Sequence, residues 1–218
     1  MSLKTAAWPA LLTIALMQIT FSATGNAHPH VWVDVKTKVD YKDGKIVGFK
    51  NSWTFDEGYS TMAIEGLDTN GDGKYDRKEL AELAQVNIDG LKEFDYFTHP
   101  KLNDARLKIG TPKDYWLERK NEILTLHFTL PLVEPVLAEA EGFTFQVYDP
   151  TFYISFEFIK KRPIVLSKGA PAGCRADVKT PNDPTADMEK LGEAFFQQFG
   201  GDIGISLAQT VTIACPAT

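Results

Sequence analysis

The sequence lacks the motifs on which common catalytic functions depend. No segment matches the nucleophile elbow GxSxG, the zinc-protease motif HExxH, the P-loop or the dinucleotide fingerprint GxGxxG. Neighbouring acids such as Asp56 and Glu57 face opposite sides of an extended chain, so they do not form a catalytic pair. No extended cluster of Lys and Arg stands out, and the formal net charge is −6. We therefore expect a protein that is not an enzyme and binds no nucleic acid.

Cysteine is also scarce. The chain has 2 cysteines, Cys174 and Cys215, and their spacing excludes a CxxC redox pair. If the chain is exported to an oxidising compartment, a disulfide is the expected state, and two buried free thiols are the alternative. Such a bridge would contribute about 4 kcal/mol by restricting the unfolded chain.

Long apolar runs are missing except near the N-terminus. Ala10 to Phe21 is almost entirely apolar, follows the single cation Lys4 and precedes small residues that end at Ala27. This pattern predicts a cleaved signal peptide over residues 1–27 and a periplasmic or otherwise exported protein. The run is shorter than the ~20 residues of a spanning helix, so an uncleaved anchor is the less favoured alternative. After cleavage the protein would not be an integral membrane protein.

The remaining chain alternates between apolar and polar residues in many short segments. Val31 to Val39 and Ile46 to Phe55 flank Asp43-Gly44, a strong hairpin signal. Further strands are expected at residues 104–109, 114–119, 123–130, 142–148, 152–158, 163–167, 174–179 and 209–215. The pattern predicts a β-rich α+β fold, with an antiparallel sheet or sandwich.

Helical spacing occurs in two places. One short helix is expected at 58–67, and apolar residues from Leu80 to Phe94 predict another. A C-terminal helix is expected from Pro184 to Phe199, with an apolar face at Met188, Leu191, Phe195 and Phe199. We therefore predict a single domain over residues 28–218, with a helix-loop-helix insert at 57–97 and a disulfide-tied segment at 168–218.

Between the two inserted helices lies the most distinctive motif. Asp68, Asn70 and Asp72 alternate, Gly73 follows, and Glu79 comes six residues later. This spacing matches the EF-hand loop, in which short oxygen-bearing side chains bind Ca²⁺ and a glycine makes the sharp bend. In that pattern a backbone carbonyl, a ninth-position acid and the final Glu also contribute. The predicted calcium ligands are Asp68, Asn70, Asp72, Lys74 (by its carbonyl), Asp76 and Glu79.

The chain contains one such loop. An unpaired site in an exported protein is expected to be weak, with a Kd of about 10⁻⁴–10⁻³ M. We favour a structural role for calcium over a sensor role, because no Met-rich segment lies beside the loop. The alternative is a solvated acidic turn that binds no metal.

Histidine suggests a second metal site. Cleavage after Ala27 would place His28 and His30 beside a free amine, and on an extended chain the two side chains share one face. Imidazole and amine nitrogens suit Zn, Ni, Co or Cu. The alternative is an exposed terminus that binds nothing. His127 could complete the site from across a sheet, although a satisfied surface histidine is favoured, and His99 is expected in a loop before Pro100.

Several segments together resemble the DUF1007 family of exported bacterial proteins. They are His28 to Asp34, Trp53 to Glu57, the acidic loop, Leu126 to Pro131, and Val147 to Tyr153. The resemblance implies an accessory of envelope metal transport or homeostasis, with a membrane metal transporter as partner. It implies no catalytic residues. From the residues, Trp53, Phe55, Tyr148 and Phe152 are expected in the core, Asp149-Pro150 in a turn, and Asp56 at a helix N-cap.

These observations predict a periplasmic, non-enzymatic protein that binds calcium and takes part in metal handling. The alternative is a calcium-stabilised interaction module that docks on a membrane transporter and binds no transition metal itself. A solute-binding protein for an organic ligand is less favoured, because the chain is too short for two α/β lobes.

Overall fold

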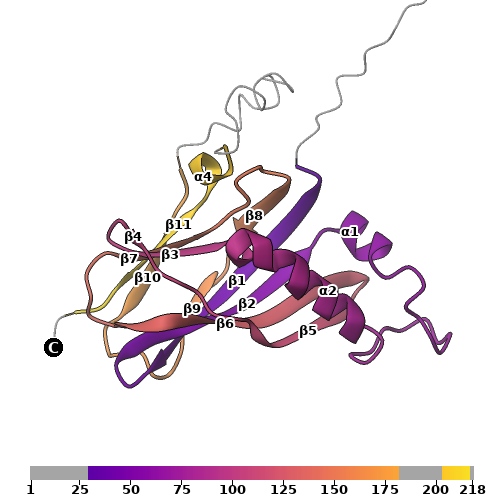
Figure 1. Cartoon of the computed structure of the whole chain (residues 1–218), viewed down its shortest axis with the longest axis horizontal. Coiled ribbons are helices and arrows are strands. Elements are labelled where there is room, and N and C mark those ends of the chain that lie inside the picture. The colour runs from indigo at the N-terminus through magenta and orange to yellow at the C-terminus, as the bar shows by residue number, and fades with distance from the viewer. Residues whose placement is uncertain (1–28, 182–202, 217–218) are drawn as a thin grey trace, which may run out of the picture.

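The computed structural model describes residues 29–181 and 203–216, which form two β-sheets and a few short helices (Figure 1). The β-rich α+β class expected from the sequence is confirmed. The predicted signal peptide and the predicted helix from Pro184 to Phe199 lie outside the described residues.

The larger sheet has six strands. Its order is β5-β6-β2-β1-β8, and β9 also pairs with β1. Most pairs are antiparallel, but β8 and β9 run parallel to β1. The strands are β1 (Val31–Lys42), β2 (Lys45–Phe55), β5 (Lys113–Lys120), β6 (Ile123–Leu137), β8 (Ile154–Phe158) and β9 (Ile164–Leu166).

The smaller sheet has five strands in the order β10-β11-β7-β3-β4. Its described pairs are all antiparallel. The strands are β3 (Thr98–Leu102), β4 (Ala105–Arg106), β7 (Phe143–Val147), β10 (Arg175–Lys179) and β11 (Thr210–Ala214).

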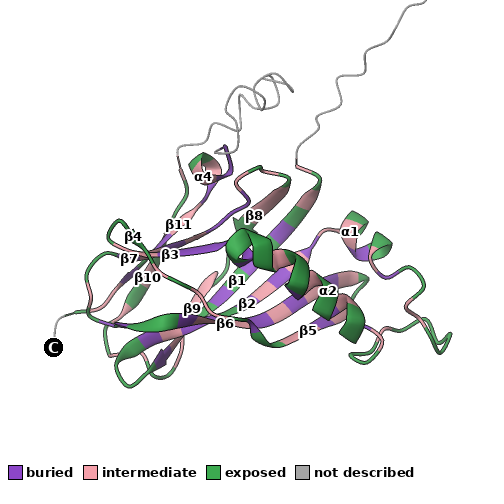
Figure 2. Ribbon diagram, viewed as in Figure 1, coloured by how far each residue is buried: buried purple, intermediate pink, exposed green. Residues whose placement is uncertain are grey.

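The predicted hairpin between β1 and β2 is confirmed. Asp43 and Gly44 both have positive φ, 51° and 70°, as a two-residue hairpin turn with the right twist requires. Alternation along β1 buries Val33, Val35, Thr37 and Val39, while the side chains of Asp34, Lys36 and Lys38 between them are exposed (Figure 2). The larger sheet therefore has one buried face and one polar face.

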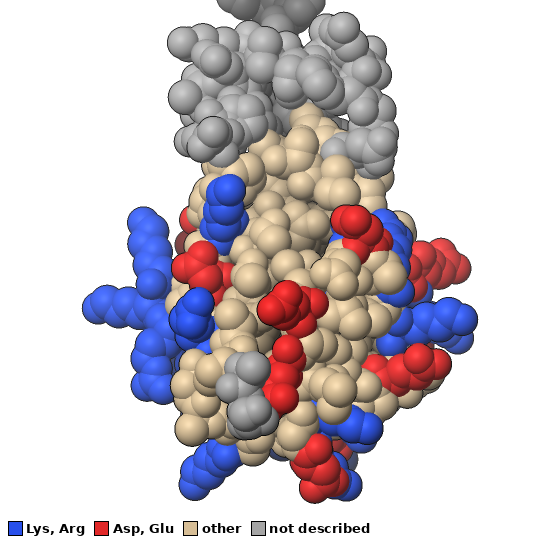
Figure 3. Space-filling model, turned by 90° about the vertical axis from the view of Figure 1, so that its left-hand side faces the viewer, with Lys and Arg blue, Asp and Glu red and all other residues tan. Residues whose placement is uncertain are grey.

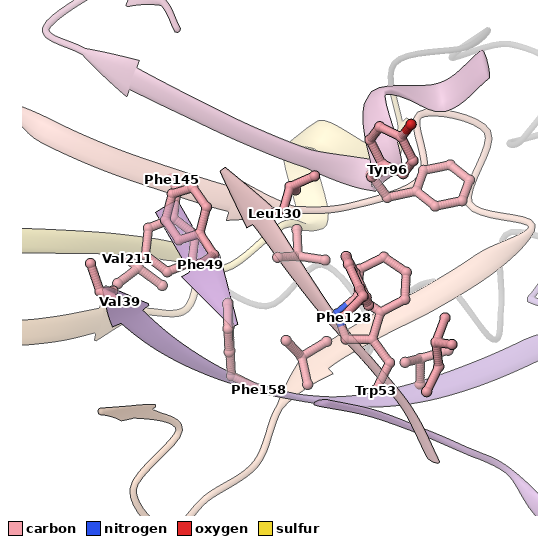
Figure 4. Close-up of a cluster of buried hydrophobic side chains, with 14 of the residues drawn as sticks. Val39, Phe49, Trp53, Tyr96, Phe128, Leu130, Phe145, Phe158 and Val211 are labelled. Carbon is pink, nitrogen blue, oxygen red and sulfur yellow. The ribbon is translucent and has the colours of Figure 1, made fainter. Parts of the chain in front are cut away.

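The core lies between the buried faces of the two sheets. The ring of Phe49 on β2 lies 4.9 Å from that of Phe145 on β7, and Phe158 on β8 contacts Phe145 edge-on (Figure 4). Trp53 on β2 packs edge-on against Phe128 on β6 at 4.9 Å. The expected burial of Trp53, Phe55 and Tyr148 is confirmed, while Phe152 is only half-buried.

Helices cover the part of the larger sheet that the smaller sheet leaves free. These helices are α1 (Glu57–Met62), α2 (Ala81–Leu91) and the 3-10 helix η1 (Lys92–Phe97). A further short helix, α4 (Ile203–Leu207), precedes β11. Ala84 and Ile88 of α2 are buried, and the Tyr115 hydroxyl of β5 donates to the Gln85 side chain of α2. The Asp56 side chain caps α1 by accepting from the Tyr59 amide at 2.9 Å, as predicted.

Several element boundaries were wrong. The first inserted helix ends at Met62 rather than at residue 67, and the second ends at Leu91, so that Phe94 is 49% exposed. The segment placed in a loop around His99 is strand β3, and the strand expected at 104–109 shrinks to Ala105–Arg106. Pro100 concealed β3. Its carbonyl accepts from the Leu107 amide on the β4 side, so the missing N–H falls outside the ladder with β7.

Candidate metal centre

The acidic loop connects α1 and α2 at the β5 edge of the larger sheet (Figure 1). Its chain direction changes sharply at Gly71 and Gly73, whose φ values are 71° and 73°. These left-handed conformations are open to glycine at little cost, which explains the sequence's use of glycine there.

Asp68 organises the first half of the loop. Its Oδ1 accepts from the amides of Gly71 and Asp72 at 2.8 Å and 3.2 Å, and its Oδ2 accepts from Gly73 at 2.9 Å. Asn70 accepts from the Asp72 amide at 2.8 Å. One carboxylate therefore holds three consecutive amides, and the loop curls around it.

Asp76 and Glu79 organise the second half. Asp76 Oδ1 accepts from the amides of Lys78 and Glu79 at 2.7 Å and 2.9 Å, while Glu79 Oε2 accepts from the Asp76 amide at 3.1 Å. This reciprocal arrangement is a capping box for the helical turn that precedes α2. The amides of Glu79 and Lys78 lower the pKa of Asp76, because they favour its charged form.

Glu79 also closes the loop. Its Oε1 accepts from both the amide and the hydroxyl of Thr69, at 3.1 Å and 3.0 Å. The last predicted ligand is thereby joined to the residue after the first one, Asp68. The structure thus brings the two ends of the predicted calcium loop together.

The fit to calcium is incomplete. Within residues 29–181 and 203–216, no group of three or more His, Cys, Asp or Glu side chains is placed to hold a metal ion together. The acidic oxygens of the loop instead accept its own amides, which offsets the repulsion between the carboxylates. The donor set nevertheless consists of hard oxygens, the type that Ca²⁺ prefers.

Two arginine–aromatic contacts attach the loop to edge strand β5. The Arg77 guanidinium of the loop lies 3.4 Å from the centre of a Trp116 ring, and the Arg119 guanidinium of β5 lies 4.9 Å from that of Tyr75. Both distances are within the range of cation–π attraction. The sequence analysis missed these anchors, for which the sequence offers only an Arg close to an aromatic residue in each segment, Tyr75 with Arg77 and Trp116 with Arg119.

The predicted histidine site is described in part. His28 lies outside the described residues. His30 is exposed, its amide donates to the Tyr153 carbonyl at 2.9 Å, and its ring lies 4.6 Å from that of Tyr153. The proposed second metal site therefore stays a prediction.

His127 does not complete that site. It lies opposite Ser52, which in turn lies opposite Lys36, six residues along β1 from His30. At the rise of a strand this separation is about 20 Å. His127 instead contacts Ser52 Oγ at 3.0 Å and Glu118 Oε1 at 3.1 Å, and stacks on Trp116 at 4.0 Å.

The two cysteines form the expected disulfide. Cys174 and Cys215 are bonded, 41 residues apart, beside the paired residues Arg175 and Ala214 of β10 and β11. The bridge therefore joins the ends of an antiparallel ladder. A disulfide of this kind is typical of an oxidising compartment.

No helix in the described part of the chain combines the length and the apolar character needed to cross a bilayer. In the face shown in Figure 3, several Lys and Arg side chains gather at the left edge, while Asp and Glu side chains lie across the middle and at the right.

The chain belongs to the family described as "Protein of unknown function (DUF1007)", whose model matches residues 12–215. It is similar to a Haemophilus influenzae protein named "Uncharacterized protein", with 26% identity over 191 residues, 87% of this chain and 91% of that protein. It is also similar to a Spirochaeta aurantia protein named "Uncharacterized 15.5 kDa protein in trpE 3′ region". That match has 33% identity over 99 residues, 45% of this chain and 70% of the relative.

Proposed function

We propose that residues 68–79 bind calcium, and that the chain is an exported, non-enzymatic protein that calcium stabilises. The observation that carries this proposal is the spacing of Asp68, Asn70, Asp72, Asp76 and Glu79 around Gly73. The hydrogen bond from the Thr69 amide to Glu79 supports the proposal. Thr69 follows Asp68, so this bond brings the first and the last predicted ligand close together.

The residues that would hold calcium are the side chains of Asp68, Asn70, Asp72, Asp76 and Glu79, together with the Lys74 carbonyl. Calcium would supply positive charge to a loop in which four carboxylates lie within twelve residues. Asp72 and Asp76 are exposed, so their side chains can change rotamer without disturbing the core. Asp68 Oδ2 and Glu79 Oε2 each accept a single amide, so each keeps a second lone pair for a cation.

A structural role for calcium follows from what the loop connects. The loop joins α1 to α2, and its Arg77 and Tyr75 contact β5. A cation that reduces motion in the loop would therefore hold the helical insert against the sheet edge. With calcium at ten times its Kd, the gain in the free energy of unfolding would be about 1.4 kcal/mol.

The test is thermal unfolding of the mature protein in chelator and in calcium up to about 10 mM, above the weak Kd expected for such a site. We expect calcium to raise the Tm of the wild type and of Glu82→Gln, a matched control on the exposed face of α2. Glu79→Gln should lose most of the calcium-dependent shift. The proposal fails if the wild type shows no shift, or if Glu79→Gln shifts as much as the control.

We further propose that the protein serves envelope metal transport, with a transition-metal site at His28 and His30. The support is the pair of histidines at the predicted mature terminus. Calorimetric titration with Zn²⁺, Ni²⁺, Co²⁺ and Cu²⁺ tests this site. Binding should vanish in a His28→Ala/His30→Ala variant and persist in His127→Ala. Binding that survives in the double variant would place the metal elsewhere.

A second candidate function is docking on a membrane transporter without binding a transition metal. It is favoured by an apolar cavity of about 530 Å³ beside α2, where Val86, Phe94 and Tyr153 are 60%, 49% and 49% exposed. Affinity capture from membranes with wild type and Val86→Asp, in calcium and in chelator, tests this function. A partner set that neither change affects would contradict it.

A further inference from the structure

A second cavity, independent of the acidic loop, opens between the two sheets. Its volume is about 440 Å³, within the range of small-ligand sites. The polar lining comes from Asp95, His99, Arg106 and Lys108, and the apolar lining includes Ile109 and Val133.

The cavity has a fixed frame because residues 107–109, which form part of its lining, connect the two sheets. The Leu107 amide donates to the Pro100 carbonyl of β3 at 2.9 Å, and the Val133 amide of β6 donates to the Lys108 carbonyl at 2.9 Å. Ile109 also forms an isolated bridge with Leu132. Both walls are therefore held by backbone hydrogen bonds.

The cations of the cavity have no acidic partner in the described parts of the chain. Neither Arg106 nor Lys108 forms an ion pair there, and Asp95 does not lie within ion-pair distance of either. Moreover, Lys101 of β3 lies directly opposite Arg106 of β4 in the antiparallel register. Like charges at opposed positions destabilise a sheet. A bound anion would relieve this repulsion.

His99 forms part of the wall and is 8% exposed. Its Nε2 lies 3.3 Å from the Tyr148 carbonyl oxygen, and its ring lies 4.0 Å from that of Tyr148. The carbonyl is an acceptor, so the Nε2 carries the proton. Burial lowers the pKa of His99, the Tyr148 carbonyl and Asp95 oppose that change, and Arg106 and Lys101 add to it. His99 is therefore neutral at pH 7, and an anion placed beside it would raise its pKa.

The backbone is also strained at residues 95–97, next to the part of the cavity lined by His99. Asp95, Tyr96 and Phe97 have φ values of 50°, 50° and 46°, and three consecutive left-handed residues other than glycine are unusual. The Thr98 hydroxyl donates to the Tyr96 carbonyl at 2.9 Å, and the Tyr148 amide donates to the Phe97 carbonyl at 3.0 Å. The surrounding structure thus holds Asp95 at the cavity against the local preference of the chain.

We propose that this cavity binds a small monocarboxylic acid, with its carboxylate beside Arg106 and Lys108 and its apolar body against Ile109 and Val133. Arg106 and Lys108, which form no ion pair in the described parts of the chain, favour a ligand that carries a negative charge. Asp95, in the same lining, disfavours a second negative charge. The apolar wall favours an aliphatic chain over a fully polar anion.

Nuclear magnetic resonance of the mature protein at pH 7 tests this inference with three probes. Hexanoate carries both the charge and the apolar body, inorganic phosphate carries charge without the body, and hexylamine carries the body with the opposite charge. We expect hexanoate to shift the resonances of His99 and of residues 106–109 with saturation, and to raise the pKa of His99. Phosphate should produce a weaker effect, and hexylamine none.

The variant Arg106→Gln/Lys108→Gln should lose hexanoate affinity at least tenfold, while Lys113→Gln, an exposed cation on β5 outside the cavity, should bind normally. The substituted side chains are exposed, so the fold should persist, and an unchanged spectrum away from the cavity checks this. The inference is overturned if hexanoate causes no saturable shift, if hexylamine binds equally well, or if the double variant binds like the control. Stronger binding of phosphate than of hexanoate would overturn the monocarboxylate assignment.

Discussion

The side chains of Asp76 and Glu79 each accept a hydrogen bond from the other residue's backbone amide, at 2.9 Å and 3.1 Å respectively. This reciprocal pair caps the turn before α2, and the same two residues are predicted calcium ligands. Because the cap accounts for both carboxylates without a metal, the two roles must be separated by experiment.

The capping role predicts different effects for two substitutions of Glu79 in chelator. Glu79→Gln keeps an oxygen that can accept from the Asp76 amide but loses the second acceptor, which serves Thr69, so the free energy of unfolding should fall slightly. Glu79→Ala removes both oxygens and should lower that free energy further, by about 0.3–1.5 kcal/mol through the lost cap. Urea denaturation measures both. Equal stabilities of the two variants would show that the cap contributes nothing.

The contact between Arg77 and Trp116 predicts that the loop stabilises the edge of the larger sheet. Arg77→Ala should lower the free energy of unfolding by about 0.5–1 kcal/mol, because the guanidinium lies over an indole ring. Denaturation followed by tryptophan fluorescence measures this loss. Lys78→Ala is the matched control, since Lys78 is an exposed neighbouring cation, and it should have a smaller effect. A loss of equal size in both variants would assign the effect to net charge.

Because of the disulfide, we predict that the free energy of unfolding depends strongly on redox conditions. Reduction, or the Cys174→Ser/Cys215→Ser variant, should lower the free energy of unfolding by about 4 kcal/mol, because the bridge closes a span of 41 residues. Chemical denaturation with and without dithiothreitol provides the measurement. Dithiothreitol should not affect the double variant, and a wild type equally stable in both conditions would contradict the prediction.

Because His99 is buried, we predict that the free energy of unfolding decreases in weak acid. Its pKa in the folded protein lies below the ordinary value of 6.5, chiefly because of burial, so the unfolded chain binds its proton more readily. Stability should therefore fall as the pH decreases below about 6.5. Urea denaturation between pH 7.5 and 5 should show a shallower decline for His99→Gln than for the wild type. Identical slopes would show that His99 does not titrate differently on folding.

Alternation of apolar and polar residues was sufficient to predict much of the fold. It located β1, β2, β6 and β7, and the pair Asp43-Gly44 located the first hairpin. The rule fails where a strand is short or contains proline, as in Thr98–Leu102. In that strand, hydrogen bonding to residues 143–147 of β7 outweighs the local preference of a proline-containing segment for a loop.

The sequence by itself determined the local chemistry: the oxygen-rich loop, the pairing of Cys174 with Cys215 and the polar face of β1. Each depends on neighbouring residues, on backbone period, or on the small number of cysteines. Only the tertiary structure decided which distant groups meet. The order of strands placed Arg77 on Trp116, brought β8 beside β1, and set unpaired cations around the cavity at His99. Contacts of this kind depend on sheet order and on packing between layers, and neither is encoded in the spacing of residues along one segment.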